Sequence, residues 1–422
     1  MQTTKQNGRG AVTVGRPTSA AFRDYHPDRG YDEAFGADLQ PRPHYRPIAD
    51  FFDALPAAHF ERRRALAEIA LRNQGITFTV NADPADTERI LPFDVWPRVI
   101  PSHEWRVIEA GLIQRVRALN LFLHDLYHTQ EVVSDGIIPA QLVLANPAFR
   151  REVHAIELPH DTYIHVAGID IIRDESGQYR VLEDNLRIPS GASYMLANRR
   201  VMTRTFPELF APQDVRFIEH YPDMLLATLR ELSPRDIAEP VIVLLTPGPA
   251  NSAYFEHMFL AQQMCIDLVE GSDLYVDEDR VWMRTTNGRR QVDVIYRRVD
   301  DDFLDPVAFR PDSLLGVPGL VQVYRHGHVA LANAVGTGVA DDKSMYAYVP
   351  QLIRYYLDEQ PILPNVETFL GAEPDGLAYM IDHAADLVFK RVDQAGGYGM
   401  LIGPQATRGQ IDRYLAQVRR EP

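Results

Sequence analysis

The stretch GIDIIRDESGQYRVLEDNLR, residues 168–187, joins two strand-like runs through a short polar segment. The dipeptide Ser176-Gly177 in that segment favours a two-residue hairpin turn. Such a turn places Glu175 opposite Gln178 and fixes the pairing of every residue farther from the tip. The stretch therefore predicts a two-stranded antiparallel ribbon.

Three oxygen-bearing side chains gather on one surface of this ribbon. Counting outward from the turn places Asp170 opposite Glu183, and Asn185 shares a face with Glu183 because side chains alternate along a strand. Carboxylate and amide oxygens suit Mg²⁺, which takes few protein ligands and fills the remaining positions with phosphate oxygens and water. A solvated hairpin with its acidic side chains in water is the alternative.

A second informative stretch is DLVFKRVDQAGGYGM, residues 386–400. Lys390 stands near the end of its strand-like run, and Gly396, Gly397 and Gly399 follow. Glycines let the backbone approach a polyphosphate closely, and a neighbouring lysine offers it a positive charge. The loop matches neither the P-loop pattern nor the dinucleotide-binding pattern. A glycine-rich surface turn is the alternative.

Composition limits the classes of partner. The 422 residues carry 43 Lys and Arg against 58 Asp and Glu, so the formal charge is −15, which argues against nucleic acid and anionic membranes. Cys265 is the one cysteine, which excludes an intrachain disulfide and a zinc site built on several thiolates. The N-terminus lacks the apolar run of a secretory signal, and no long apolar stretch predicts a membrane span. We expect a cytoplasmic, multi-lobed α/β protein.

Changes of pattern along the chain predict its organisation. A helical pattern begins at Pro47 and predicts a helix with apolar residues from Phe51 to Leu71 and Gly75 as its stop. The same period predicts a second helix over 104–128, and a further helix is predicted over 346–357. A strand at 241–247 followed by a helix at 254–264 predicts an open α/β lobe.

Five regions follow: a flexible tail and arm at 1–45, a mainly helical region at 46–150, the acidic hairpin with its flanks at 151–237, the α/β lobe at 238–345, and the lysine and glycine-loop region at 346–422.

The acidic hairpin and the lysine with its glycine loop together resemble the ATP-grasp superfamily. In ordinary members the lysine and loop come first, whereas here 170–185 precedes 390–399. That order resembles the circularly permuted ATP-grasp group, which is related to glutathionylspermidine synthase. The resemblance spans roughly residues 30–405, and it includes the runs FLHDLYH, LEDNLRIPSGASYML, LTPGPANSAYFEH, YRRVDDDFLDP and ANAVGTGVADDK.

The resemblance implies an ATP-grasp fold in circularly permuted order, with a helical N-terminal region and an open α/β substrate lobe. It also implies ADP-forming ligation, in which a substrate carboxylate becomes an acyl phosphate and an amine then displaces phosphate. The substrate would be a peptide or a small amino compound.

On this basis Asp170, Glu183 and Asn185 hold Mg²⁺, while Lys390 and the glycine loop hold the phosphates of ATP. Arg187 would stabilise the transferring phosphoryl group. The alternative for Arg187 is an exposed arginine that pairs with Asp184 or a neighbour.

Substrate contacts are expected from the α/β lobe. Asn251 and Ser252 follow a strand and turn, where open α/β sheets bind ligands. Lys343 is either an N-terminal helix charge or a second anion contact.

Arg297, Arg298 and Asp300 stand near a strand end and would grip a substrate carboxylate and amine. Surface charge at the strand end is the alternative for the two arginines.

Two departures from the family pattern leave other functions open. Arg391 and the run Gln394-Ala395-Gly396-Gly397 replace the usual residues after the lysine, and 23 residues follow Gly399, fewer than the family normally has. The sequence thus predicts a shortened second ATP-grasp half. The alternatives are a degenerate scaffold that binds a partner or nucleotide without turnover, and an ATP-dependent small-molecule kinase. Family members are often encoded beside helical and transglutaminase-like proteins, which indicates a protein partner.

Overall fold

The computed structural model describes residues 22, 25–26, 30–78, 89–90, 92–211, 214–392 and 399–420. The chain divides into two compact units. The first takes its described residues from 1–105, 173–178 and 195–217, and the second takes them from 106–172, 179–194 and 218–422.

The first unit is mainly helical and has an aromatic core. It contains α1 (Arg46–Ala54), α2 (Ala57–Asn73), the short pair β1 (Thr77–Phe78) and β2 (Arg89–Ile90), and most of α6 (Ala192–Thr205). Tyr45 stacks on Trp96 with ring centroids 6.0 Å apart, and Phe52 lies 5.7 Å from Phe206. Burial of these rings stabilises a small unit that has few strands.

The single helix predicted from Phe51 to Leu71 is wrong. Pro56 separates α1 from α2, and the preceding residue, Leu55, is extended with ψ of 119°. A residue before proline disfavours the helical region, so the helix has to end there although the apolar period continues.

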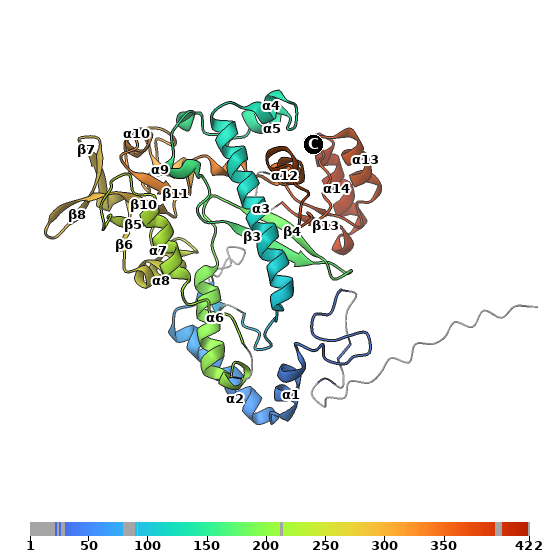
Figure 1. Cartoon of the computed structure of the whole chain (residues 1–422). Coiled ribbons are helices and arrows are strands. Elements are labelled where there is room, and N and C mark those ends of the chain that lie inside the picture. The colour runs from blue at the N-terminus through green and yellow to red at the C-terminus, as the bar shows by residue number, and fades with distance from the viewer. Residues whose placement is uncertain are drawn as a thin grey trace, which may run out of the picture. The chain divides into compact units, whose positions relative to one another are not determined.

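The second unit is built around the long helix α3 (Ser102–Tyr127), which belongs to this unit from Arg106 onward. Beside it lies the hairpin of β3 (Gly168–Arg173) and β4 (Tyr179–Asn185), as Figure 1 shows. The short helices α4 (Glu131–Ser134) and α5 (Ala140–Leu144) follow α3.

A four-stranded parallel sheet forms the centre of this unit, in the order β11-β10-β5-β6. Its strands are β5 (Ile242–Leu245), β6 (Asp267–Val269), β10 (Val294–Arg297) and β11 (Ala330–Ala332). Every residue of β5, β10 and β11 is buried, as expected for parallel strands covered on both faces.

Helix α8 (Tyr254–Met264) connects β5 to β6 and confirms the helix predicted over the same residues. It ends at Cys265, which is exposed and has a left-handed φ of 55°. Helix α7 (Tyr221–Glu231) precedes β5.

An antiparallel sheet of three strands follows β6. It consists of β7 (Leu274–Asp277), β8 (Arg280–Thr285) and β9 (Gly288–Val292). The short helices α9 (Asp301–Leu304) and α10 (Leu320–Arg325) lie between β10 and β11.

The C-terminal part is helical with one small sheet. Its elements are α11 (Lys343–Tyr346), α12 (Val349–Leu357), α13 (Pro374–Asp382), β12 (Val388–Phe389), β13 (Leu401–Ile402) and α14 (Arg408–Val418). Phe389, Ala384 and Leu415 form its small core. The helix predicted over 346–357 is divided at Ala347 and Tyr348, and Pro350 stands in the first turn of α12.

The predicted fold class is confirmed, because the chain combines helices with parallel and antiparallel sheets. None of the helices in the described residues is long and apolar enough to cross a membrane. The expected tail at 1–45 falls largely outside the described residues.

Candidate active site

The hairpin turn differs from the predicted one by a residue. The amide of Gly177 donates to the carbonyl of Asp174 (2.9 Å), and the amide of Asp174 donates to the carbonyl of Gln178 (2.9 Å). Asp174 rather than Glu175 therefore faces Gln178, and the predicted register is wrong at the tip. Gly177 has a left-handed φ of 84°, which suits a three-residue turn that ends in glycine.

The three predicted metal ligands nevertheless lie together. The side chain of Asn185 hydrogen-bonds to Asp170, whose pKa is raised first by burial and then by the negative charge of Glu183. The charge of Lys390 opposes this rise. The negative charge of Glu183 thus lies close enough to Asp170 to disfavour the ionised form of Asp170.

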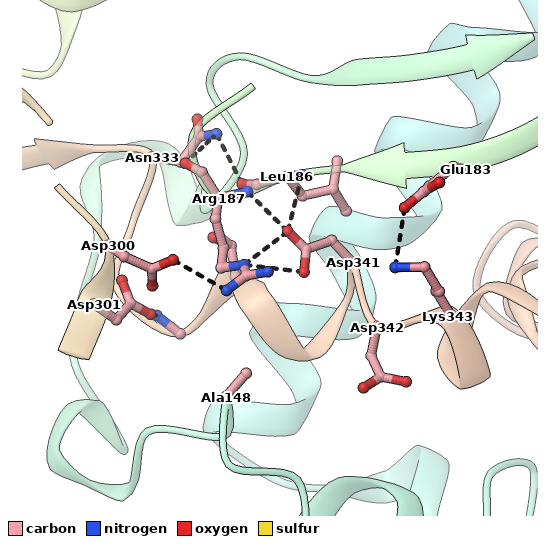
Figure 2. A network of polar contacts seen from close by, with 12 residues as sticks. Ala148, Glu183, Leu186, Arg187, Asp300, Asp301, Asn333, Asp341, Asp342 and Lys343 are labelled. Atoms are coloured by element: carbon pink, nitrogen blue, oxygen red, sulfur yellow. Dashed lines mark hydrogen bonds and ion pairs between the residues drawn. The ribbon is translucent and has the colours of Figure 1, made fainter. Parts of the chain in front are cut away.

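Two lysines supply positive charge at this site. Lys343 Nζ lies 3.2 Å from Glu183 Oε1, and Lys390 Nζ lies 3.4 Å from Glu183 Oε2. Each oxygen of one carboxylate thus has its own ammonium partner; Figure 2 shows the contact of Lys343. Lys390 comes one residue after β12, as the sequence predicts.

This donor set fits a magnesium ion. Asp170, Glu183 and Asn185 offer hard oxygen atoms, and the raised pKa of Asp170 indicates that a further cation would be favourable there. The lysines that now contact Glu183 are also of the right charge for phosphate.

Asp184 lies between Glu183 and Asn185 in the sequence, but it pairs with a buried arginine and is not part of the candidate metal site. Its carboxylate forms a bidentate pair with Arg115 of α3, with Nε–Oδ1 of 2.7 Å and Nη2–Oδ2 of 2.6 Å. Both side chains are 1% exposed. This pair ties β4 to α3 and leaves Glu183 and Asn185 to the candidate metal site.

Arg187 lies between two carboxylates, Asp341 and Asp300 (Figure 2). Its Nε donates to both oxygens of Asp341 (3.1 and 3.0 Å), and its Nη1 donates to Asp300 (3.2 Å). Burial acts against its charge, but Asp341 and Asp300 outweigh that effect and raise the pKa of Arg187. The sequence alternative of a pair with Asp184 is wrong, although pairing with other residues is observed.

Asp341 fixes the backbone as well as the side chain of Arg187. Its Oδ2 accepts the amides of Leu186 (3.3 Å) and Arg187 (3.2 Å). Burial raises the pKa of Asp341 to about 6, against the opposing charge and hydrogen bonds of Arg187. A Cβ atom on Gly338 would come within 2.7 Å of Arg187 Cδ, so only glycine leaves room for this side chain.

Asn333 connects the end of β11 to the chain after β4. Its amide nitrogen donates to the carbonyls of Leu186 (2.8 Å) and Arg187 (3.3 Å), and its Oδ1 accepts the amides of His165 (2.7 Å) and Val166 (2.8 Å). The hairpin exit is thereby held at the carboxyl edge of the parallel sheet, the edge at which such sheets bind ligands.

The predicted substrate residues lie at this same edge, in different environments. Asp300 follows β10 and contacts Arg187, as described above. Asn251 and Ser252 are exposed in the β5–α8 connection, where Asn251 Oδ1 accepts the amide of Ala253 (2.9 Å).

Arg297 and Arg298 are buried, so the interpretation as surface charge is wrong. Arg297 is 0% exposed, donates to the carbonyls of Asn333, Val299 and Ala334, and pairs with Asp301. Arg298, 3% exposed, binds the carbonyl of Pro189, the hydroxyl of Tyr296 and the carboxylate of Glu256. These contacts favour a structural role for both arginines.

The glycine loop is only partly described. Gly396 and Gly397 lie outside the described residues. Gly399 has a left-handed φ of 67°, and its carbonyl accepts the hydroxyl of Tyr414 of α14 (2.7 Å).

Sequence reasoning missed Asp341, Asn333 and Glu256. The first two lie in ANAVGTGVADDK and the third in LTPGPANSAYFEH, runs that carry the family resemblance without revealing a role. Asp341 and Asn333 contact residues about 150 positions away, as the separations of 154 and 147 residues show. A local pattern gives no signal for such partners.

Comparisons with known proteins show the family of this chain. The model of a family described as a circularly permuted ATP-grasp matches residues 97–422. An uncharacterised protein of Synechocystis sp. (strain ATCC 27184 / PCC 6803 / Kazusa) is 51% identical over 401 residues, which cover 95% of this chain and 83% of that protein. An uncharacterised protein of Mycobacterium tuberculosis (strain ATCC 25618 / H37Rv) is 47% identical over 93% of this chain and 70% of its own length.

A protein of Frankia alni named "Putative glutamate--cysteine ligase 2-3" is 40% identical over 98% of this chain and 48% of its own length. This chain therefore spans about half of that relative. Among solved structures, a glutathione synthetase-like effector of Globodera pallida in its apo form has a TM-score of 0.47 and 15% identity, over 72% of this chain and 69% of that one.

Proposed function

Because the chain belongs to the circularly permuted ATP-grasp family, we propose that it is an ATP-dependent ligase that joins a carboxylate to an amine and forms ADP. The observation that carries the proposal is the meeting of Glu183 with Lys343 and Lys390 beside Asp170 and Asn185. The proposed metal ligands thus lie beside two cations that suit phosphate, which supports the proposal.

We assign Asp170, Glu183 and Asn185 to Mg²⁺. When bound, the ion would neutralise charge on the terminal phosphates of ATP during transfer. The chain holds these ligands in place through Arg115, which anchors the neighbouring Asp184, and through the Asn185–Asp170 hydrogen bond.

Lys390 and Lys343 would change partners when nucleotide binds. Without ligand they balance the charge of Glu183 at 3.4 and 3.2 Å. With Glu183 engaged by the cation, both ammonium groups can turn to phosphate oxygens a few ångströms away, and Gly396, Gly397 and Gly399 would let the backbone follow.

Arg187 would stabilise the charge on the phosphoryl group as it leaves ADP. Its side chain is 37% exposed, and Asp341 and Asp300 hold its guanidinium group, so the side chain is both accessible and oriented. A charged group that needs no rearrangement at the moment of reaction contributes most to stabilising a transition state.

The proposed reaction has two steps. An oxygen of the substrate carboxylate attacks the γ-phosphorus, the bond to the β,γ-bridging oxygen breaks, and ADP leaves. The amine nitrogen then attacks the acyl carbon, the carbon–oxygen bond to phosphate breaks, and the amine loses a proton. Asn251, Ser252 and Asp300 at the sheet edge are our candidates for orienting the substrates.

The organisation that supports this activity is also proposed. We assign the metal half of the ATP-grasp to 151–237, the substrate lobe to 238–345, the lysine and loop half to 346–422, the helical region to 46–150 and an arm to 1–45. The name of the Frankia alni relative favours an amino acid as one substrate. Reliance on ATP favours a cytoplasmic location.

Calorimetry with Mg²⁺ and ATP tests the binding step. We expect binding by the full chain that requires Mg²⁺ and is lost in the Asp170→Ala, Glu183→Ala double variant. Glu175→Gln is the matched control, because Glu175 is an exposed carboxylate at the tip of the same hairpin. Well-folded protein that binds no nucleotide would overturn the ligase and favour a scaffold without turnover.

A second assay separates ligation from simple phosphorylation. ADP release should require both an acid and an amine, and an acid with hydroxylamine should give a hydroxamate from the acyl phosphate. ADP release with a single substrate and a stable phosphorylated product would instead identify a small-molecule kinase.

A further inference from the structure

One cluster of ligand-type side chains lies outside the candidate active site. Asp279 stands in the turn between β7 and β8, and His326 and His328 stand between α10 and β11. His326 Nδ1 lies 2.9 and 3.0 Å from the two carboxylate oxygens of Asp279, and His328 Nδ1 lies 2.7 Å from Oδ2. Two imidazoles therefore converge on a single carboxylate.

The backbone holds these three residues at fixed points. Asp279 has a left-handed φ of 57°, and its carbonyl accepts Arg280 Nη1 (2.8 Å). The amide of His326 donates to Gln322 (3.1 Å), and that of His328 donates to Val323 (3.1 Å), so both close the C-terminal turn of α10. The side chains start from anchored positions and do not have to be ordered from a flexible loop.

Within the described part of the chain, these residues form the one group of three or more His, Cys, Asp or Glu whose ligand atoms all lie within 4.8 Å of one another. A zinc ion with bonds of about 2.0–2.2 Å to nitrogen and oxygen holds its ligand atoms roughly 3.3–3.5 Å apart. The spacing therefore needs only small side-chain rotations.

We propose that Asp279, His326 and His328 bind one divalent transition-metal ion of the zinc type. The ion would join the β7–β8 turn to the α10–β11 connection. Three protein ligands leave a fourth position for water or for another donor.

The chemistry distinguishes this site from the acidic hairpin. Imidazole nitrogen suits zinc, copper and nickel, whereas the oxygen set of Asp170, Glu183 and Asn185 suits Mg²⁺. The two sites share no residue, so each can be removed without the other.

Titration of the metal-free full chain with Zn²⁺, followed by calorimetry, tests the proposal. The Asp170→Asn, Glu183→Gln background removes carboxylates that also attract Zn²⁺. Within it, we expect one ion per chain, and roughly tenfold or weaker binding after His326→Gln or His328→Gln. Co²⁺ in place of Zn²⁺ should give visible absorption bands that the same substitutions abolish.

His59→Gln is the matched control, because His59 is an exposed histidine of α2 that lies outside the cluster. It should leave both the stoichiometry and the affinity unchanged. Zn²⁺ binding that is equally strong in His326→Gln and His328→Gln, or no binding of Zn²⁺ at all, would show that the cluster is a set of surface ion pairs and overturn the proposal.

Discussion

Glu183 forms ion pairs with two lysines at the same time. These pairs affect how the ligand-free site can bind ATP. Lys343 and Lys390 occupy its two oxygens, so ATP without a metal meets ammonium groups that are already paired. On the proposed mechanism, a cation that binds Glu183 would release both lysines toward phosphate. Mg²⁺ and ATP should therefore bind with strong mutual dependence.

Loss of either lysine tests this exchange. We expect Lys390→Met and Lys343→Met each to weaken binding of Mg²⁺–ATP by about 10–100-fold, since a hydrogen bond between charged groups contributes about 1.5–3 kcal/mol. Calorimetry at fixed Mg²⁺ measures the change. Arg391→Met, which removes a cation next to Lys390 in the chain, is the control. Equal losses in all three variants would indicate general charge rather than specific contacts.

Asp170 should make the ligand-free protein less stable as pH rises. Its folded-state pKa is raised above 3.8, first by burial and then by Glu183, so stability is greatest below pH 3.8 and falls as pH passes through the folded pKa. Asp170→Asn removes this effect. The variant should be more stable than the unmodified chain at pH 7 and equal to it at pH 3.5.

Urea unfolding at the two pH values measures the difference. Asp174→Asn is not a suitable control, because Asp174 holds the turn through Ser176 and Gln178. Glu175→Gln is suitable, and it should show no such pH dependence. Lower stability of Asp170→Asn at pH 7 would contradict the assigned repulsion.

The buried ion pair of Arg115 and Asp184 should contribute more to the free energy of unfolding than an exposed ion pair does. Asp184→Asn should lower the free energy of unfolding by about 3–5 kcal/mol, because it leaves a buried guanidinium without its charge partner. The Arg115→Met, Asp184→Leu double variant should lose much less. Arg63→Met, which breaks a pair that is 27% and 48% exposed, should cost about 1 kcal/mol or less.

At the scale of elements, helix α8 holds the segment 190–193, which follows the proposed metal ligands of the hairpin. The buried carboxylate of Glu256 accepts Ser190 Oγ (2.7 Å), the amide of Gly191 (2.7 Å) and both the amide (3.1 Å) and hydroxyl (2.9 Å) of Ser193. Arg298 Nη2 lies 3.2 Å from the same carboxylate. One residue of α8 thus orders the entry to α6.

Glu256→Gln tests this support. We expect a loss of about 2–4 kcal/mol in stability, because Arg298 loses its charge partner. In addition, the side-chain NH₂ of the new glutamine would face hydrogen-bond donors that the carboxylate now accepts. Thermal unfolding measures the loss. Gln262→Glu adds a charge at an exposed position of the same helix and serves as a control for altered charge on α8. An unchanged melting temperature in Glu256→Gln would show that the backbone orders this segment without the carboxylate.

Helices and strands with a clear local sequence pattern could be predicted from the sequence. The ends of helices that depend on a proline or on packing against distant residues could not. The helix over 254–264 is confirmed, and it connects the parallel strands β5 and β6 as a strand followed by a helix predicts. The helix over 51–71 is divided because a proline overrides the apolar period. The hairpin was predicted, but its turn is one residue longer.

The whole molecule shows why the family could be predicted and the full site could not. The ligand types Asp170, Glu183, Asn185 and Lys390 occur in short recognisable runs, and the fold brings Lys390 to Glu183 across 207 residues. The partners of Arg187 come from two further connections, which no single run reveals. Arg297 and Arg298 lie at the end of a predicted strand, and the sequence there does not show that both side chains are buried.

Ligand binding should stabilise the whole chain only when both components are present. Because the linkage of binding to folding gives about 2.7 kcal/mol at a ligand concentration 100 times the dissociation constant, Mg²⁺ with ATP should raise the melting temperature by several degrees. ATP with a chelator, or Mg²⁺ alone, should give a small shift. A full shift with ATP and a chelator would contradict the exchange at Glu183.

The ion pairs of Glu183 also constrain how such a protein can change over evolutionary time. Loss of the carboxylate alone would leave two neighbouring ammonium groups in mutual repulsion, and loss of one lysine would leave the acidic hairpin less compensated. A lineage released from selection for catalysis should therefore discard these three side chains together, as a group.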